Sequence, residues 1–183
     1  LKGDVLYLLG ADEIPVNAIG KDTFVIYQGH HGDRAAARAD VILPGAAYTE
    51  KNALYVNNEG RPQRAKQATF PPGEAREDWK IIRALSEVVG KALPYNDLAA
   101  GRARLVEANP IFGGIDQIKP AAWKPFGKDG ATDKSPFALP IANFYMTDAI
   151  SRASIVMAEC TKAFVQDKKE KTDSRTASPA PAR

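Results

Sequence analysis

The amino-acid sequence predicts an α/β fold in which a small, mostly parallel sheet is flanked by helices. Three short apolar runs, at residues 4–10, 23–29 and 39–45, each end in glycine and have the composition of buried strands. The connections between them are about a dozen residues long, which is near the minimum for a crossover between parallel strands. These runs and their spacing together favour parallel pairing.

Shorter elements are expected around this sheet. Residues 33–39 predict a short helix in the second crossover, with Asp33 as its N-cap. Residues 54–57 and 61–64 predict a β-hairpin, because Gly60 stands where its turn needs a positive φ.

Two helices are expected next along the chain. Within residues 71–94 the apolar residues recur at helical spacing, and Gly90 ends the pattern. Asn96 is expected to cap a second helix that runs to about Ala108 and stops before Pro110.

The remaining sequence divides into three zones. Residues 111–143 show no lasting period and, with Pro110, hold five of the 13 prolines, which predicts an irregular segment that wraps over a partner. Thr147 or Asp148 can cap a helix with Ile150, Ala153, Met157 and Phe164 on its apolar side. We therefore expect an α/β domain at 1–110, the irregular segment, a C-terminal helix region at 144–166 and a disordered tail at 167–183.

Composition excludes several kinds of site. The 183-residue chain is 44% hydrophobic and 26% charged, as in a globular protein. Its longest apolar run, residues 5–11, is too short for a membrane helix of about 20 residues, so we expect no direct membrane insertion. A single cysteine, Cys160, excludes an internal disulfide and any metal site built from several thiolates of this chain. We therefore expect no metal site in this chain.

The positive charge of the chain is concentrated at its end. Of a net charge of +3, residues 166–183 contribute five Lys and Arg against three Asp and Glu. Surfaces that bind nucleic acid cluster their bases and often add aromatic residues, and this tail has none. We expect no nucleic-acid partner.

Both histidines lie in the motif Gly29-His30-His31-Gly32-Asp33. Adjacent residues on an extended segment point in opposite directions, so His30 and His31 are poorly arranged to chelate one ion. Two interpretations remain open for this motif. It is either a plain turn after the second strand, or an edge of the sheet at which a ligand meets His30, His31 and Asp33.

The turn after the first strand, Gly10-Ala11-Asp12, lies at the same expected edge. An acid at such an edge often contacts a ribose or pterin-like group. Neither of the two glycine-rich phosphate-binding loops occurs in the sequence. Cys160 is expected to be a packed thiol, because neither histidine is near it in sequence to act as a base. The sequence thus indicates no catalytic residue.

Six contiguous blocks carry a resemblance to a known family. They are residues 27–33, 39–51, 55–57, 59–61, 74–87 and 144–154. In this order they resemble the large iron–sulfur subunit of respiratory complex I, both as it occurs in bacterial NADH:quinone oxidoreductase and in its mitochondrial equivalent. The resemblance runs from about residue 5 to residue 160 and is weakest between 111 and 141.

The resemblance implies a molybdopterin-oxidoreductase-like fold. The C-terminal half of that family is similar to molybdopterin enzymes such as formate dehydrogenase. The cofactor-binding region of those enzymes contains a strand and an Asn-x-Glu-Gly-Arg turn that residues 40–44 and 57–61 match, with Glu50 between them. Vestigial binding candidates on this basis are Gly10, Asp12, His30, His31, Asp33 and Glu50, although we expect no cofactor on this chain.

The resemblance also implies a structural role in the peripheral arm of a proton-translocating enzyme. The chain is then expected to support electron transfer from NADH to quinone without a redox centre of its own. Iron–sulfur clusters are expected in a cysteine-rich N-terminal part of the subunit that is missing here, and FMN in a neighbouring subunit.

The expected partners are other peripheral-arm subunits of complex I. The expected location is the cytoplasmic side of a bacterial inner membrane or the matrix side of the mitochondrial one. The sequence begins with Leu1 rather than methionine, which leads us to expect a fragment or one product of a split subunit. Two alternatives remain open. The chain could be a fragment of a molybdopterin enzyme such as formate dehydrogenase, in which the candidate residues named above would contact the pterin dinucleotide. It could also be a free-standing small-molecule binding domain.

Overall fold

A computed structural model describes residues 3–11, 13–32, 34–120 and 122–166 of the chain. Its contacts divide the chain into two units, Leu1–His30 with Arg34–Gly127 and His31–Asp33 with Lys128–Arg183. The predicted disordered tail at 167–183 lies outside the described residues. Within them, no helix combines the length and the apolar character that a membrane crossing requires.

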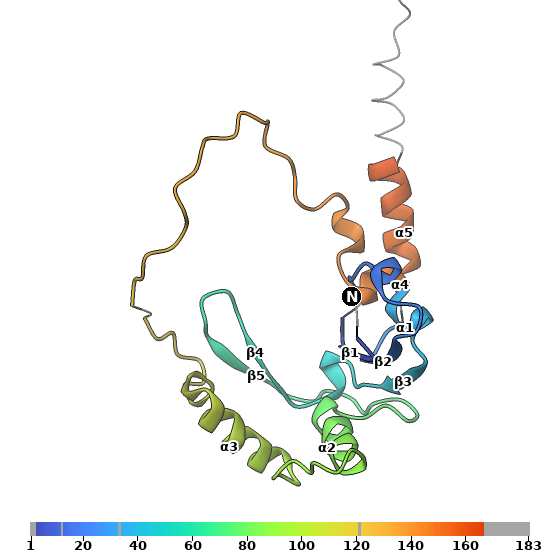
Figure 1. Ribbon diagram of the computed structural model, residues 1–183, viewed down its shortest axis with the longest axis vertical. Helices are drawn as coiled ribbons and strands as arrows, with labels where there is room; N and C mark the ends of the chain where they lie inside the picture. Colours follow the sequence, from blue (N-terminus) through green and yellow to red (C-terminus); the bar gives the residue numbers. More distant parts are fainter. Residues whose placement is uncertain (1–2, 12, 33, 121, 167–183) are drawn as a thin grey trace, which may run out of the picture. The chain divides into compact units, whose positions relative to one another are not determined.

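The first unit contains a three-stranded parallel sheet (Figure 1). Its strands are β1 (Val5–Leu9), β2 (Phe24–Gly29) and β3 (Val41–Pro44), with β2 in the middle. The predicted α/β fold with its parallel sheet is therefore confirmed. Helix α1 (Arg34–Arg38) occupies the second crossover, as expected, and the 3₁₀ turn η1 (Val16–Ala18) occupies the first.

The core of this unit lies on one face of the sheet. Its buried members are Leu8, Ile19, Val25, Tyr27 and Ala35, contributed by the two paired strands, the first crossover and α1. Burying one large apolar side chain fully stabilises a fold by about 1.5–3 kcal/mol. By contrast, Val5, Leu9 and Ile42 are each more than half exposed, so the outer strands leave much apolar surface uncovered.

The predicted hairpin is present as β4 (Ala53–Val56) and β5 (Pro62–Ala65), which pair antiparallel. A short 3₁₀ turn, η2 (Tyr48–Glu50), precedes it. Gly60 adopts φ 78° in the hairpin turn, a conformation that favours glycine. The Asn57 Oδ1 atom accepts hydrogen bonds from the backbone N–H groups of Glu59 and Arg61, each at 3.0 Å, which fixes the turn.

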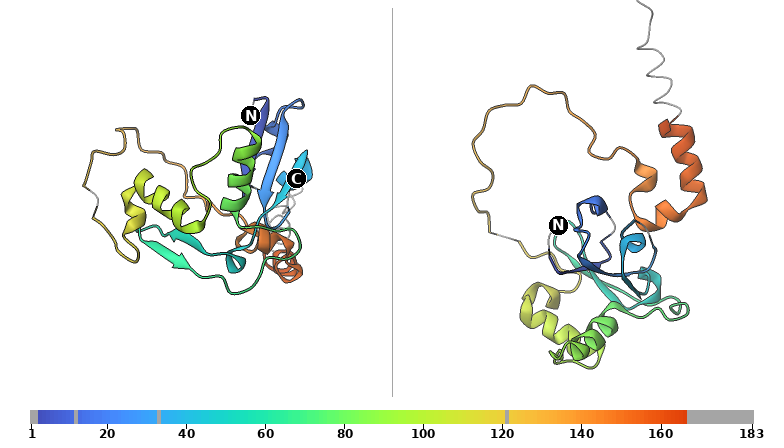
Figure 2. Two further views of the ribbon diagram at one scale, coloured as in Figure 1. Left: turned by 90° about the horizontal axis from the view of Figure 1, so that it is seen from below. Right: turned by 45° about the vertical axis from the view of Figure 1, so that its right-hand side comes forward.

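Helix α2 (Asp78–Val88) begins beside the carboxyl ends of the sheet strands, and Figure 2 shows it next to them. A parallel bridge between Gly45 and Arg76 brings the chain to this position. Gly90 adopts φ 73° just after the helix, where a left-handed residue commonly ends one. The predicted helix is therefore found, with its first turn placed against the sheet.

The next helix, α3 (Leu98–Ala108), begins one residue later than expected. Its N-cap is Asp97, whose Oδ1 atom accepts a hydrogen bond from the Ala100 N–H at 2.8 Å. The prediction of Asn96 as the cap was wrong, because the Asn96 side chain accepts a hydrogen bond from Arg83 of α2 at 2.8 Å.

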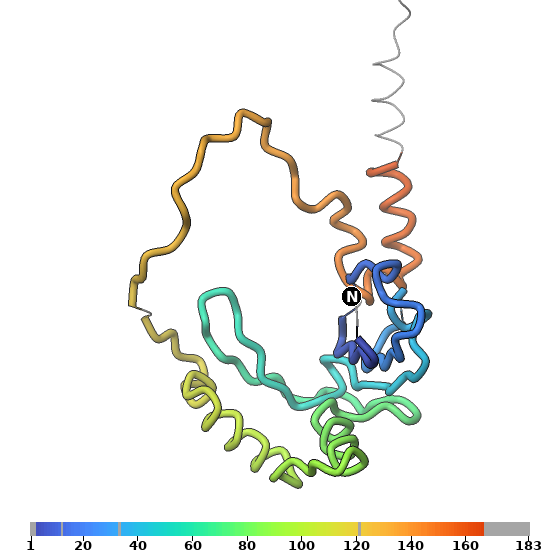
Figure 3. The backbone as a smooth tube through the Cα atoms, viewed as in Figure 1, coloured from blue at the N-terminus to red at the C-terminus, as the bar shows by residue number. Residues whose placement is uncertain are grey.

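A short 3₁₀ helix, η3 (Pro110–Gly113), follows α3. None of the described residues from 114 to 143 lies in a helix or strand, and Figure 3 traces them as an extended tube. The start of this segment is fastened to the hairpin, because the Asp116 N–H donates to the Pro62 carbonyl at 2.8 Å.

The second unit contains the expected C-terminal helical region, divided into several pieces. After η4 (Phe144–Met146) come α4 (Ala149–Ala153), α5 (Ile155–Thr161) and the π-helical turn η5 (Lys162–Gln166). Asp148 caps α4, as one of the two expected residues. The division falls at Ser154, which is extended and accepts a hydrogen bond from the Met157 N–H, so its hydroxyl starts a new helix.

Candidate functional site

A network of one buried and three partly buried polar side chains links the carboxyl end of the sheet to the start of α2. Gln28, in the central strand, is fully buried. The Tyr7 hydroxyl donates to Gln28 Oε1, and Gln28 Nε2 donates to Asp78 Oδ1 at 2.9 Å. The other Asp78 carboxylate oxygen pairs with Lys51 Nζ. Four side chains from four separate segments therefore satisfy one another, as buried polar groups must.

The surroundings of Tyr7, the first residue of this polar network, keep its hydroxyl neutral. Burial raises the pKa of the Tyr7 hydroxyl, and the nearby Asp78 carboxylate raises this pKa further. A neutral hydroxyl is a hydrogen-bond donor, so it holds the amide of Gln28 with its oxygen toward Tyr7. The amide NH₂ then faces Asp78, and the direction of every hydrogen bond in the network is fixed.

A second carboxylate, Glu77, lies beside the first. Its oxygens accept from the Asn52 N–H at 3.3 Å and from Trp79 Nε1 at 3.1 Å, and it pairs with Lys80 at 3.0 Å. Burial raises the pKa of Glu77, but the hydrogen bonds from Lys80, Asn52 and Trp79 outweigh burial and lower this pKa overall. Glu77 is therefore held as a carboxylate that ties the loop before β4 to α2.

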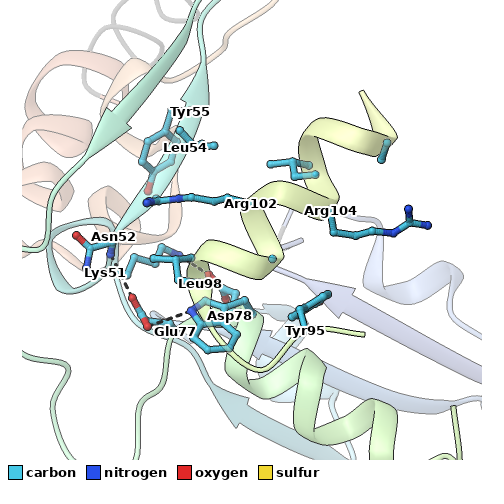
Figure 4. A pocket seen from close by; sticks show the side chains of 15 residues that line it. Lys51, Asn52, Leu54, Tyr55, Glu77, Asp78, Tyr95, Leu98, Arg102 and Arg104 are labelled. Atoms are coloured by element: carbon cyan, nitrogen blue, oxygen red, sulfur yellow. Dashed lines mark hydrogen bonds and ion pairs between the residues drawn. The ribbon is translucent and has the colours of Figure 1, made fainter. Parts of the chain in front are cut away.

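A pocket of about 590 Å³ opens next to this network (Figure 4). Its walls come from the loop and strand at residues 51–55, from residues 77–79 and from α3. Aromatic and aliphatic side chains form most of the lining, and Lys51, Arg102 and Arg104 add positive charge. The volume falls within the range of small-molecule sites, about 300–1,000 Å³.

The structure describes four of the sequence-predicted candidates, which are Gly10, His30, His31 and Glu50. Gly10, at φ 60°, donates its N–H to the Gln28 carbonyl at 2.7 Å and thus closes the end of β1. The Glu50 carboxylate accepts from the Ala47 N–H at 2.9 Å within its own turn. His30 is exposed and His31 is half-buried, in the turn after β2. Asp12 and Asp33 lie outside the described residues.

Two polar side chains at this sheet edge, Gln28 and Asp78, are bonded to protein partners. A pterin needs free donors and acceptors, whereas the amide of Gln28 and both oxygens of Asp78 are occupied by protein partners. The edge is also closely packed, because a Cβ atom on Gly45 would lie 3.1 Å from Asp78 Oδ1 and 3.5 Å from the Gly29 carbonyl carbon. No group of three potential metal ligands occurs in the described part of the chain.

Sequence reasoning missed the polar network of Tyr7, Gln28, Asp78 and Lys51. Its signal was present, because Tyr7 and Gln28 are polar interruptions of otherwise apolar strands, and a buried polar group needs a partner. The partners themselves lie 21 and 50 residues apart in sequence, so spacing does not reveal them. Cys160, half-buried in α5, is a free thiol.

Two family models match this chain. Residues 1–88 match the model of molybdopterin oxidoreductases, which covers the sheet, the hairpin and α2. Residues 117–160 match the model of the C-terminal region of the G subunit of NADH–ubiquinone oxidoreductase. The first match agrees with the α/β fold, and the second falls on the irregular segment and the helices that follow it.

Curated relatives match most of the chain. The mitochondrial 78 kDa subunits of NADH–ubiquinone oxidoreductase from Candida albicans and Neurospora crassa are 52% and 51% identical over 89% and 88% of it. The mitochondrial NADH dehydrogenase [ubiquinone] iron–sulfur protein 1 of Solanum tuberosum is 46% identical over 85%. The chain spans 22–24% of the length of these relatives. The chain therefore belongs to the family of the large iron–sulfur subunit of NADH–ubiquinone oxidoreductase, of which it represents about a quarter.

Proposed function

We propose that this chain is a structural segment of the C-terminal part of the large iron–sulfur subunit in the peripheral arm of complex I. In this role it supports electron transfer from NADH to quinone, in a proton-translocating enzyme, without carrying a redox centre. The observation that carries the proposal is the identity of about half of the residues to the 78 kDa subunits over nearly nine-tenths of the chain. The names of these relatives favour this role over that of a formate dehydrogenase fragment.

The packing of the sheet edge supports a role without a cofactor. Gln28 and Asp78 stand where the parallel strands end, and their hydrogen bonds hold the sheet to α2 instead of remaining free for a ligand. We assign no cofactor to the candidates named above: Gly10, Asp12, His30, His31, Asp33 and Glu50. The iron–sulfur clusters then belong to other parts of the subunit, and FMN to a neighbouring subunit.

The irregular segment at 111–143 supports a role in contact with other subunits. Four of its large apolar side chains are strongly exposed, at 88% for Trp123, 82% for Phe126, 79% for Leu139 and fully for Phe137. Trp123 and Phe126 lie together, with ring centroids 5.8 Å apart, and contiguous exposed apolar groups mark interaction surfaces. We assign them to other peripheral-arm subunits, on the matrix side of the mitochondrial inner membrane or the cytoplasmic side of a bacterial one.

Purification of the native complex tests this proposal. The complex is isolated through its NADH oxidation activity and separated by native electrophoresis, and the band is examined for peptides of this chain. We expect peptides of this chain, in constant ratio to activity across the band. An active complex that lacks the chain would contradict the proposal, and molybdenum with a pterin in proportion to the chain would favour the molybdopterin enzyme.

A further inference from the structure

Among the described residues that line the pocket, one cationic side chain takes part in no ion pair. Asp78 pairs with Lys51, Glu77 with Lys80, and Arg104 with Glu107 at 2.7 Å. Arg102 also lines the pocket and is half-buried, and it has no hydrogen bond or ion pair with any described residue. A guanidinium is rarely buried fully without a partner, because its charge is costly to desolvate, so a molecule that covers Arg102 would need to bring an anionic group to it.

The side chain of Arg102 points from α3 toward the hairpin (Figure 4). In Figure 4 it extends toward the β4 strand, near the labelled Leu54 and Tyr55, whereas Arg104 points the other way. An anionic group bound there would lie between α3 and the hairpin. The rest of the wall combines apolar and aromatic residues, among them Leu98, Leu105 and Tyr95. Its other charged residues are already in ion pairs: Lys51, Glu77, Asp78 and Arg104.

Apart from the buried Pro62, the side chains of the two elements that form the pocket are half-buried or exposed. No residue of α3 is buried, although Leu98 and Leu105 are among its apolar residues. The hairpin of β4 and β5 is a separate two-stranded sheet, and such a hairpin is marginally stable alone. A polypeptide segment would cover exposed side chains along both elements, whereas a small ligand would cover only those that line the pocket.

We propose that the pocket between the β4–β5 hairpin and α3 is the docking site for a partner polypeptide segment that carries a carboxylate beside one large apolar side chain. The carboxylate pairs with Arg102, and the apolar side chain packs among Leu54, Leu98 and Leu105. Tyr, Trp and Arg are the residues that dominate protein–protein contacts, and the wall contains all three types. This inference rests on the proposed function, since it names the chemistry of one partner of the same assembled subunit.

Photo-crosslinking within the assembled complex tests the proposal. The photoreactive residue p-benzoylphenylalanine replaces Ala108, which is exposed at the pocket wall, and in a matched variant replaces Ala103, which is exposed on α3 outside the lining. We expect position 108 to link to a segment in which Asp or Glu stands beside a large apolar residue, and position 103 not to link to it. A link only to lipid or to a small molecule, or no link at position 108, would overturn the proposal.

Charge reversal then tests the role of Arg102. Arg102→Glu should lower the yield of this cross-link by at least about tenfold, as for the loss of one strong contact, whereas Arg102→Lys should lower it less. The cross-link at position 108 identifies the acidic residue of the partner segment. Changing that residue to Lys should restore the cross-link yield of the Arg102→Glu variant, or restore assembly if Arg102→Glu alone prevents it. Failure of this rescue would overturn the pairing. Absence of the chain from active complex refutes the proposed function itself, whereas its presence without a cross-link refutes only the docking site.

Discussion

Gln28 Nε2 donates a hydrogen bond to Asp78 Oδ1 at 2.9 Å, although 50 residues separate the two in sequence. This contact joins the middle strand of the sheet to the first residue of α2. Asp78 also forms an ion pair with Lys51, which precedes the first strand of the hairpin. One carboxylate therefore positions the sheet, the hairpin and the helix relative to each other within the first unit.

Replacing Asp78 by alanine should destabilise the chain. The change removes the acceptor of the buried Gln28 amide and the partner of Lys51, and an unsatisfied buried polar group costs about 1–3 kcal/mol. We expect a loss of about 2–3 kcal/mol in the free energy of unfolding, measured by urea denaturation followed by circular dichroism.

The matched control for this change is Glu74→Ala. The Glu74 side chain is 89% exposed and pairs with Arg76 at 3.1 Å, so this variant removes a surface ion pair only. Its free energy of unfolding should change by less than about 1 kcal/mol. Equal effects of the two substitutions would show that the buried network contributes nothing particular to stability.

Gly29→Ala should also destabilise the chain, for a steric reason. A Cβ atom at Gly29 would lie 2.6 Å from Cζ of Tyr27, a ring that is buried in the core and has little room to move. Forcing extra volume into a packed core typically costs about 1–3 kcal/mol. Thermal unfolding should show a lower midpoint than for Gly130→Ala, whose added Cβ would meet no atom within 4 Å.

The sequence predicted those elements whose signals are local. Each strand of the parallel sheet is one continuous apolar run that ends near glycine, and this pattern needs no information from elsewhere in the chain. The hairpin was also predictable from a local signal. Gly60 indicates a turn with a positive φ, a conformation that few other residues adopt. The irregular segment followed from its prolines and glycines alone.

Features decided by competition between distant residues were not predictable. Asn96 and Asp97 are both good N-caps, and the choice between them is made by Arg83 of α2, which binds the Asn96 side chain. Likewise, the helical period from residue 150 to 164 runs across Ser154, yet the hydroxyl of Ser154 caps a second helix. The candidate site, built on Gln28 and Asp78, depends on partners that no short motif contains.

Stability should fall in acid through Glu77. Its pKa in the folded chain lies below the ordinary value of 4.5, so the folded state favours the carboxylate. For a lowered pKa, the added stability is present above the unfolded pKa and is lost as the pH falls through the folded pKa. Between about pH 7 and pH 3, Glu77→Gln should therefore flatten the decline in unfolding free energy, measured by urea titrations at each pH.

The control for the acid prediction is the exposed Glu74→Gln. Its decline in stability with falling pH should match that of the unchanged chain. At neutral pH, Glu77→Gln should be the less stable variant, because Glu77 is only 12% exposed and bonds to Asn52 and Trp79. A decline for Glu77→Gln as steep as that of the unchanged chain would contradict a role for this carboxylate.

Limited proteolysis should distinguish the irregular segment at 111–143 from the rest of the chain. In the isolated chain its backbone lacks helix and strand hydrogen bonds among the described residues from 114 to 143, so trypsin should cut first at Lys128 or Lys134. In the assembled complex the same bonds should be protected, because the exposed Trp123, Phe126 and Phe137 would lie against a neighbouring subunit. Cleavage sites are mapped by mass spectrometry of the fragments over time. Resistance of this segment in the isolated chain, or equal cleavage in both forms, would mean that it does not wrap over a partner.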